Sequence, residues 1–384
     1  MSFEAPLAWL QLKREPVRFS VALAGVAFAV ILVFMQFGFY DALFRSAVRL
    51  HEHLETDLVL ISPKSLYLAG MKSFSRRRLY QALGFDGVAA VAPVYAGLAL
   101  WKNPRSGKAR LIFVSGFNPK DGVLDLPDVT ANLDKLRLPD MVLFDRASRP
   151  EYGPIASDVE AGELVTTEVS DRRITVVGLF QLGTSFGIDG TLITSDLNFR
   201  RLFPNRHQGL IDIGLIKLKP GVNPQAVRQA LETALPRDVT VLTKAGYLEH
   251  EKSYWQAATP IGFVFTFGAI MAIVVGGVIV YQVLFTDISS HLKEYATLKA
   301  MGYRNLDLIA LVFQEALILA VLGYLPGIAA ALWLFRTAAR ATLLPMLMSW
   351  SRMLQVLTLT GLMCGIAGAM ALRKIRSADP AEVF

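Results

Sequence analysis

Four long apolar runs dominate the pattern of hydrophobic and polar positions along the chain. They cover residues 19–40, 261–285, 308–335 and 354–372. A helix needs about 20 residues to cross ~30 Å of hydrocarbon, so each run predicts one transmembrane helix. The first run is longer than the ~7–15 apolar residues of a signal peptide, and we expect it to remain as an anchor.

Small residues recur inside these runs, and they allow neighbouring helices to approach closely. They are Gly25, Gly276, Gly277, Gly323, Gly327, Gly361, Gly365 and Gly368. We therefore expect the four helices to pack against one another within the membrane.

Lysine and arginine in short flanking segments predict the orientation of the spans. Three groups of them lie before the first run, between the second and third runs, and after the fourth. These groups are Lys13, Arg14 and Arg18; Lys293, Lys299 and Arg304; and Arg373, Lys374 and Arg376. An even number of spans puts all three groups on one side, which predicts that both termini are cytoplasmic. The chain is expected to be a multi-pass protein of the inner (plasma) membrane.

The spans divide the rest of the chain into segments with different expected locations. Residues 1–18 mix Trp and Leu with basic residues, which predicts a cytoplasmic amphipathic helix. Residues 286–307 form a cytoplasmic loop, and residues 373–384 form a cytoplasmic tail. The long segment 41–259 then lies in the periplasm.

This periplasmic segment changes from a helical to a strand-like pattern. Residues 41–55 keep an apolar face with helical spacing, so the first span is expected to continue outward as a stalk. Runs rich in β-branched residues predict strands at 57–62, 88–102, 109–117, 141–145, 174–182, 191–195, 211–218 and 239–244. With helical patterns near 75–83 and at 224–235, the order favours an α+β fold. We expect a ferredoxin-like porter part with a β-rich insertion at roughly 119–203.

The composition agrees with a membrane location. Hydrophobic residues make up 53% of the chain and charged residues 18%, and the mean hydropathy is +0.42, whereas soluble domains are about 25% charged. The net charge is +7. Because the basic residues flank the apolar runs, anionic lipid headgroups explain their placement better than nucleic acid does.

Residue patterns typical of enzymes are absent from the sequence. There is no G-x-x-x-x-G-K-[ST] loop, so ATP and its magnesium ion would be bound by another polypeptide. None of the five histidines has metal-site spacing, and His51 and His53, two positions apart, are expected to be solvated stalk residues. The single cysteine, Cys364, is expected to be a packed side chain. We predict a non-catalytic subunit with no cofactor or metal of its own.

Ionisable residues are nearly absent inside the predicted spans. The exception is Glu315, near the cytoplasmic end of the third run, which is either a functional group facing a cavity or a contact between helices. Spans this apolar are poorly suited to pass a polar solute. They favour helices that move as packed rods and transmit force from the cytoplasm to the exterior.

The loop after the second span has a helical pattern of its own. Ile288, Leu292, Tyr295 and Ala296 fall on one face of a helix. Gly302 can supply the left-handed cap at its C-terminus. The pattern alone is compatible with an ordinary surface helix between two spans.

The run KEYATLKAMGY, at residues 293–303, resembles the coupling-helix signature of FtsX/MacB-like permeases. Further stretches resemble the DevC subgroup of that family, and they lie at 56–63, 178–203, 313–327 and 373–384. The resemblance implies the permease subunit of a type VII ABC exporter, working as a homodimer with a separate ATPase. MacB-type chains carry a fused ATPase before the first span, whereas 18 residues precede it here, so the DevC arrangement is the one implied.

The resemblance also implies partners and a contact site. The loop after the second span would dock on the ABC ATPase through Lys293, Glu294, Tyr295, Leu298, Lys299 and Gly302. A periplasmic membrane-fusion adaptor and a TolC-like outer-membrane protein would complete the efflux path, with membrane lipid around the spans. DevC relatives are associated with glycolipid export, which implies a lipid or glycolipid cargo driven out by mechanotransmission.

Two other functions stay open at this point. An FtsX-like regulator would use the same rods to activate an envelope hydrolase and would transport nothing. A membrane-anchored binding or assembly protein would need no ATPase. Proteins that co-purify would separate the three, because an adaptor and a duct indicate export, whereas a hydrolase indicates regulation.

Overall fold

The computed structural model describes residues 16–290 and 305–377. Most of the expected amphipathic helix in residues 1–18 lies outside these described residues. The described chain forms two compact units, which we call the membrane unit and the outer unit. The membrane unit holds residues 16–42, 261–290, 305–341 and 346–377, and the outer unit holds residues 43–260 and 342–345.

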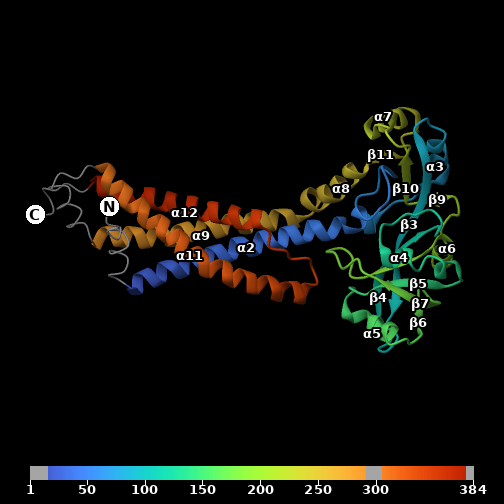
Figure 1. Cartoon of the computed structure of the whole chain (residues 1–384), viewed down its shortest axis with the longest axis horizontal. Helices are drawn as coiled ribbons and strands as arrows, with labels where there is room; N and C mark the ends of the chain where they lie inside the picture. The colour runs from blue at the N-terminus through green and yellow to red at the C-terminus, as the bar shows by residue number, and fades with distance from the viewer. Residues whose placement is uncertain (1–15, 291–304, 378–384) are drawn as a thin grey trace, which may run out of the picture. The chain divides into compact units, whose positions relative to one another are not determined.

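Four helices of the described chain are long and apolar enough to cross a membrane (Figure 1). They are α2 (Pro16–Glu52), α9 (Pro260–Ser290), α11 (Asn305–Thr342) and α12 (Trp350–Ser377). The outer unit is inserted between α2 and α9. This arrangement confirms the predicted fold class of four spans with an α+β domain between the first two. Helix α2 includes the stalk predicted at 41–55 as far as Glu52.

Helix α2 is the most buried of the four spans. In its most apolar window 44% of the residues are buried, against 22–33% in the other three helices. Glycines on α11 permit this packing, because a Cβ on Gly323 would lie 2.6 Å from Val26 and one on Gly327 would lie 2.7 Å from Val30. Gly361 on α12 differs, since no heavy atom lies within 4 Å of a Cβ built on it.

A nine-stranded sheet forms the centre of the outer unit, in the order β11-β1-β10-β3-β4-β8-β5-β7-β6 (Figure 1). The strands are β1 (Leu58–Ile61), β3 (Val88–Lys102), β4 (Ala109–Phe117), β5 (Met141–Asp145), β6 (Val165–Val169), β7 (Arg172–Phe180), β8 (Thr191–Ser195), β10 (Ile213–Leu218) and β11 (Thr240–Thr243). A separate pair is formed by β2 (Phe74–Ser75) and β9 (Leu210–Ile211).

Two β-α-β units build one half of this sheet. Helix α3 (Arg76–Leu83) connects β1 to β3, and helix α7 (Pro224–Ala234) connects β10 to β11. Their strands interleave in the order β11-β1-β10-β3, which is the ferredoxin-like arrangement expected from the sequence. Helix α7 begins where Asn223 accepts a hydrogen bond from the Gln225 amide, with Pro224 in the first turn.

Strand β3 is shared between this half and the insertion. Its first part pairs with β10, and its second part, from Val94 to Lys102, pairs with β4. The insertion continues through β8, β5, β7 and β6, and it returns to β3 where Trp101 pairs with Val169. The β-rich insertion therefore closes on the end of the same strand from which it starts.

The two faces of the sheet are covered by different helices. Leu79 of α3 and Leu231 of α7 belong to one apolar core. Leu50 and Leu54, at the end of α2, belong to a second core together with Tyr247. The last turns of α2 are thus packed onto the sheet of the outer unit.

Short helices fill the remaining connections. They are η1 (Leu68–Gly70), α4 (Pro127–Thr130), η2 (Lys135–Arg137), η3 (Pro150–Tyr152), α5 (Ile155–Glu160), α6 (Asp196–Leu202), α8 (Lys244–Ser253) and the π-helical turn η4 (Tyr254–Ala258). Helix α8 leads through η4 into α9, so it connects the outer unit to the second span.

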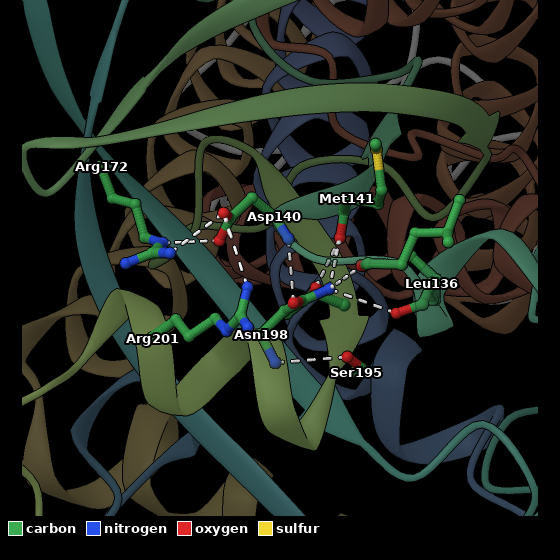
Figure 2. Close-up of polar contacts among 9 residues, drawn as sticks. Leu136, Asp140, Met141, Arg172, Ser195, Asn198 and Arg201 are labelled. Atoms are coloured by element: carbon green, nitrogen blue, oxygen red, sulfur yellow. Dashed lines mark hydrogen bonds and ion pairs between the residues drawn. The ribbon is translucent and has the colours of Figure 1, made fainter.

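A polar network holds the insertion together around Asn198 (Figure 2). The Asn198 amide donates to the carbonyls of Leu136, Leu138 and Met141, and its oxygen accepts from the Asp140 amide. Arg172 donates two hydrogen bonds to the Asp140 carboxylate, at 2.5 and 3.0 Å. These bonds fix α6, η2 and β5 relative to one another.

Candidate functional site

The six residues expected to contact an ATPase lie outside the described residues. They are Lys293, Glu294, Tyr295, Leu298, Lys299 and Gly302. The structure describes the two helices that lead to them, because α9 ends at Ser290 and α11 begins at Asn305. The ATPase contact therefore stays a prediction.

Arg49 joins the end of α2 to the segment that follows β7. Its guanidinium donates a hydrogen bond to the Leu182 carbonyl. The next residue, Gly183, has φ +94°, and a Cβ added to it would overlap the Arg49 guanidinium. Only glycine permits both the backbone conformation and this close approach.

Asp145, the last residue of β5, holds the same segment through its backbone. Its carboxylate accepts hydrogen bonds from the Leu182 amide at 3.1 Å and the Gly183 amide at 2.7 Å. Burial raises the pKa of Asp145, and the backbone donors and the positive charge of Arg49 oppose that shift. Together these contacts form a joint that connects the last turns of α2 to β5 and to the segment that follows β7.

His51 is buried, with 1% of its surface exposed, so the expectation of a solvated stalk residue is wrong. The reason is that helix α8 packs against this face of α2. Its Nε2 lies 3.5 Å from Glu251 Oε2, and its ring centroid lies 4.4 Å from that of Tyr247. His53 is partly exposed, and its Nδ1 lies 3.0 Å from the Asp125 carbonyl oxygen.

Glu251 is the centre of this buried cluster. Its carboxylate accepts hydrogen bonds from the Leu68 amide at 2.8 Å and from Trp255 Nε1 at 3.0 Å. Burial raises the pKa of Tyr247 well above its ordinary value, and the charge of Glu251 adds to the shift. His51 lies on α2 and Glu251 lies on α8. The cluster therefore connects the helix that enters the outer unit to the helix that leaves it.

The described residues contain no group of three metal-ligating side chains.

The membrane unit holds two notable sites with charged side chains. Glu315 of α11 is completely buried. Near the other end of the spans, Arg352 of α12 forms an ion pair with Asp41 of α2 and lies 5.0 Å from the centre of the Phe37 ring. Asp41 and Phe37 both lie on α2 and Arg352 lies on α12, so these two contacts link the first and last helices of the membrane unit.

A cavity of about 840 Å³ lies beside this ion pair, between α2, α9 and α12. Its walls are largely apolar, with polar groups around Arg352. The lining residues are Phe37, Tyr40, Asp41, Phe265, Thr266, Ala269, Ile270, Ile273, Ser351, Arg352, Leu354, Gln355, Thr358 and Leu359. This combination suits an amphiphile better than a polar solute.

Two family models match the chain, and together they cover most of it. The model of the MacB-like periplasmic core domain matches residues 19–234, which is more than half of the chain, and that of the FtsX-like permease C-terminal region matches residues 266–380. The chain belongs to the FtsX/MacB-like family of type VII ABC permeases. This permease is therefore a multi-pass inner-membrane subunit of ABC type, and the family implies an ABC ATPase as its partner.

Three solved structures of single regions or domains are similar to part of this permease. The periplasmic region of MacB from Actinobacillus actinomycetemcomitans shares 11% identity at a TM-score of 0.36, covering 54% of this chain and 95% of that one. The extracellular domain of the ABC-type transporter YknZ from Gram-positive bacteria shares 13% identity at a TM-score of 0.32, covering 49% and 98%. A domain of a permease protein from Porphyromonas gingivalis shares 15% identity at a TM-score of 0.30, covering 50% and 90%. No curated protein matches this chain.

The sequence pattern did not identify Arg49, Asp145 or Glu251. Arg49 is one polar position among several in the predicted stalk. A signal was available for Asp145, because it is the only charged residue of the run MVLFD and directly follows buried strand positions. Leu182 and Gly183 lie in the stretch 178–203 that carried the family resemblance.

Proposed function

We propose that this permease is the transmembrane subunit of an ATP-driven exporter that works by mechanotransmission. In this proposal a homodimer binds a separate ABC ATPase at residues 286–307 on the cytoplasmic side, where both termini lie. It drives a lipid or glycolipid cargo toward a periplasmic adaptor and a TolC-like outer-membrane duct.

The observation that carries the proposal is the length of α2. It is one helix of 37 residues, and at about 1.5 Å per residue it extends for roughly 55 Å, well beyond the ~30 Å of the hydrocarbon core. A helix without a break can pass an axial displacement from one end to the other. The joint at Arg49 and the cluster at His51 give that displacement two points of attachment in the outer unit.

The second span has a comparable connection. Glu251 and Trp255 lie on the segment that runs from α8 through η4 into α9. Movement of the spans by an ATPase would therefore enter the outer unit through two helices that are tied together at His51 and Glu251. The scarcity of ionisable residues within the spans supports force transmission over conduction of a polar solute.

The cavity between α2, α9 and α12 supports a lipid-type cargo. Its apolar walls would accept acyl chains, and Ser351, Arg352 and Gln355 would face a polar headgroup. A cargo of this class would enter from the membrane rather than from the cytoplasm.

A charge reversal in the predicted ATPase contact tests the proposal. Glu294→Arg should leave the full-length protein folded but separate ATP hydrolysis from cargo release in vesicles that contain the permease and its ATPase. Glu249→Arg is the matched control, because Glu249 is exposed on the outer unit, and it should leave both rates unchanged. Normal coupled transport in the Glu294→Arg variant would contradict the proposal.

Purification of the full-length permease from its own membranes separates the remaining possibilities. Recovery of an ABC ATPase with an adaptor and a duct agrees with export. Recovery of an ATPase with an envelope hydrolase, and no transport, would instead indicate an FtsX-like regulator.

A further inference from the structure

We infer that Phe186 and Leu66 form a lipid-contacting surface of the outer unit and enter the headgroup region of the membrane. The surface consists of two loops, residues 64–67 and 183–188, that lie far apart in the sequence. The inference holds for an exporter and for a regulator, because it depends only on the four membrane-spanning helices.

The depth of Trp255 follows from its position along the chain. It lies five residues before Pro260, the first residue of the second span. Helical residues rise about 1.5 Å each, so Trp255 lies within roughly 10 Å of the end of that span. The interfacial layer on each side of the hydrocarbon core is about 5–8 Å thick. Trp255 and Tyr254 are therefore at headgroup level, where Trp and Tyr are enriched.

Aromatic contacts bring both loops to the same level. The Tyr67 ring stacks on the Tyr254 ring with a centroid distance of 4.5 Å, and the Phe186 ring lies 6.0 Å from the Trp255 ring. A Cβ on Gly187 would lie 3.0 Å from Trp255, so glycine lets this loop approach the indole closely. The depth of the two loops is thus set by η4.

A second, independent contact holds loop 183–188 to the connection between the third and fourth spans. The Thr184 hydroxyl donates a hydrogen bond to the Leu343 carbonyl at 3.1 Å. Leu343 directly follows Thr342, the last residue of α11. Successive spans alternate in direction, so this connection lies on the same side of the membrane as the outer unit. Loop 183–188 therefore contacts two segments of the outer unit, each of which lies next to a different span along the chain.

Exposed apolar side chains complete the argument. Phe186 is 51% exposed and Leu66 is 56% exposed, while the residues that hold their loops, Thr184 and Leu68, are buried. Large apolar side chains on two loops that are fixed at headgroup level fit a lipid surface, because contact with acyl chains removes them from water.

Depth-dependent fluorescence quenching tests the inference on the full chain. The single native cysteine is replaced by Cys364→Ala, and an environment-sensitive fluorophore is attached at Phe186→Cys or Leu66→Cys in phosphatidylcholine vesicles. Both labels should show blue-shifted emission, quenching by lipid with a nitroxide near the headgroup, and protection from aqueous iodide.

Leu138→Cys is the matched control, because Leu138 is 56% exposed but lies between η2 and β5, outside the two loops that contact η4. Its label should be quenched by iodide and not by nitroxide lipid. The inference fails if the label at 186 behaves like the one at 138. It also fails if that label is protected from both quenchers, because a second copy of the chain or another protein would then cover the loop.

Discussion

Nε2 of His51 lies 3.5 Å from Oε2 of Glu251, and both side chains are almost completely buried. Removing two ionisable groups from water costs free energy, and replacing a buried ion pair with apolar residues is often neutral or stabilising. The pair is therefore a poor device for stability alone. Its position, between the helix that enters the outer unit and the one that leaves it, agrees with a role in holding the two together.

A double-mutant cycle measures this link directly. His51→Phe and Glu251→Gln should each lower the free energy of unfolding by about 2–4 kcal/mol, because each breaks a buried pair by changing one of its two members. The double variant should cost less than the sum, with a coupling energy of about 1–3 kcal/mol. Denaturant unfolding of the full-length protein in detergent micelles gives all three values.

His53→Phe is the control for this cycle. His53 is partly exposed and lies just beyond the end of the same helix, two residues after His51, so its replacement should cost less than about 1 kcal/mol. Strict additivity of the His51 and Glu251 substitutions would show that the two side chains are neighbours without an energetic link.

The joint at Arg49 gives a second prediction. Gly183→Ala should destabilise the outer unit and reduce the coupling of ATP hydrolysis to transport, because the added Cβ overlaps the Arg49 guanidinium and strains a residue at φ +94°. The measurement is the unfolding midpoint together with the ratio of cargo released to ATP hydrolysed.

Gly162→Ala is the control that separates the effect of backbone strain from the effect of overlap with Arg49. Gly162 has φ +82° but no heavy atom within 4 Å of the added Cβ, so it should cost only the roughly 1–2 kcal/mol of backbone strain and leave coupling intact. Equal effects of the two substitutions on coupling would argue against a special role for the Arg49 joint.

Much of the fold could be predicted because its signals are local. The spans follow from apolar length, and strands such as 88–102 and 109–117 follow from β-branched runs that the structure reproduces. Strand β6 was missed, because its buried Val165, Thr167 and Val169 alternate with polar residues and the run VTTEV is short. Alternation over five residues is a weak signal beside the long runs.

The candidate site was much less predictable, because its contacts are not local. Arg49 and Leu182 are 133 residues apart, and the Glu251 carboxylate and the Leu68 amide are 183 residues apart. His51 was assigned to a solvated face, since helical periodicity places residues on a face but does not tell whether another element, here α8, covers it. Such contacts require the tertiary fold.

Packing of α11 on α2 gives a third prediction. Gly327→Val should lower the unfolding midpoint of the full-length protein, because its side chain would enter the space of Val30, whose Cγ1 lies 2.7 Å from the Cβ position. Overpacking of this kind typically costs about 1–3 kcal/mol. Gly361→Val adds the same side chain where no atom lies within 4 Å, and it should change the midpoint little. If both variants lower the unfolding midpoint by similar amounts, the replacement of glycine itself, and not overlap with Val30, would be the cause.

Asp140 gives a prediction about pH. The two hydrogen bonds donated by Arg172 hold the pKa of the Asp140 carboxyl below its usual value, against the opposing effect of burial. The unfolded chain therefore binds a proton more readily at this position than the folded chain does. The stability that results is fully present above the unfolded pKa of about 3.9, and it is lost as the pH falls through the folded pKa.

Asp140→Asn removes the charge and keeps a residue type that tolerates the φ of 62° at this position. It should lower the free energy of unfolding by about 1 kcal/mol at pH 7, since the pair is partly exposed, and the deficit should shrink as the pH falls below about 4 and through the folded pKa of Asp140. Asp134→Asn, at an 87% exposed carboxylate in the same region, should show no deficit over the same pH range. A deficit for Asp140→Asn that does not shrink with falling pH would mean that hydrogen-bond geometry, rather than the carboxylate charge, holds Arg172 in place.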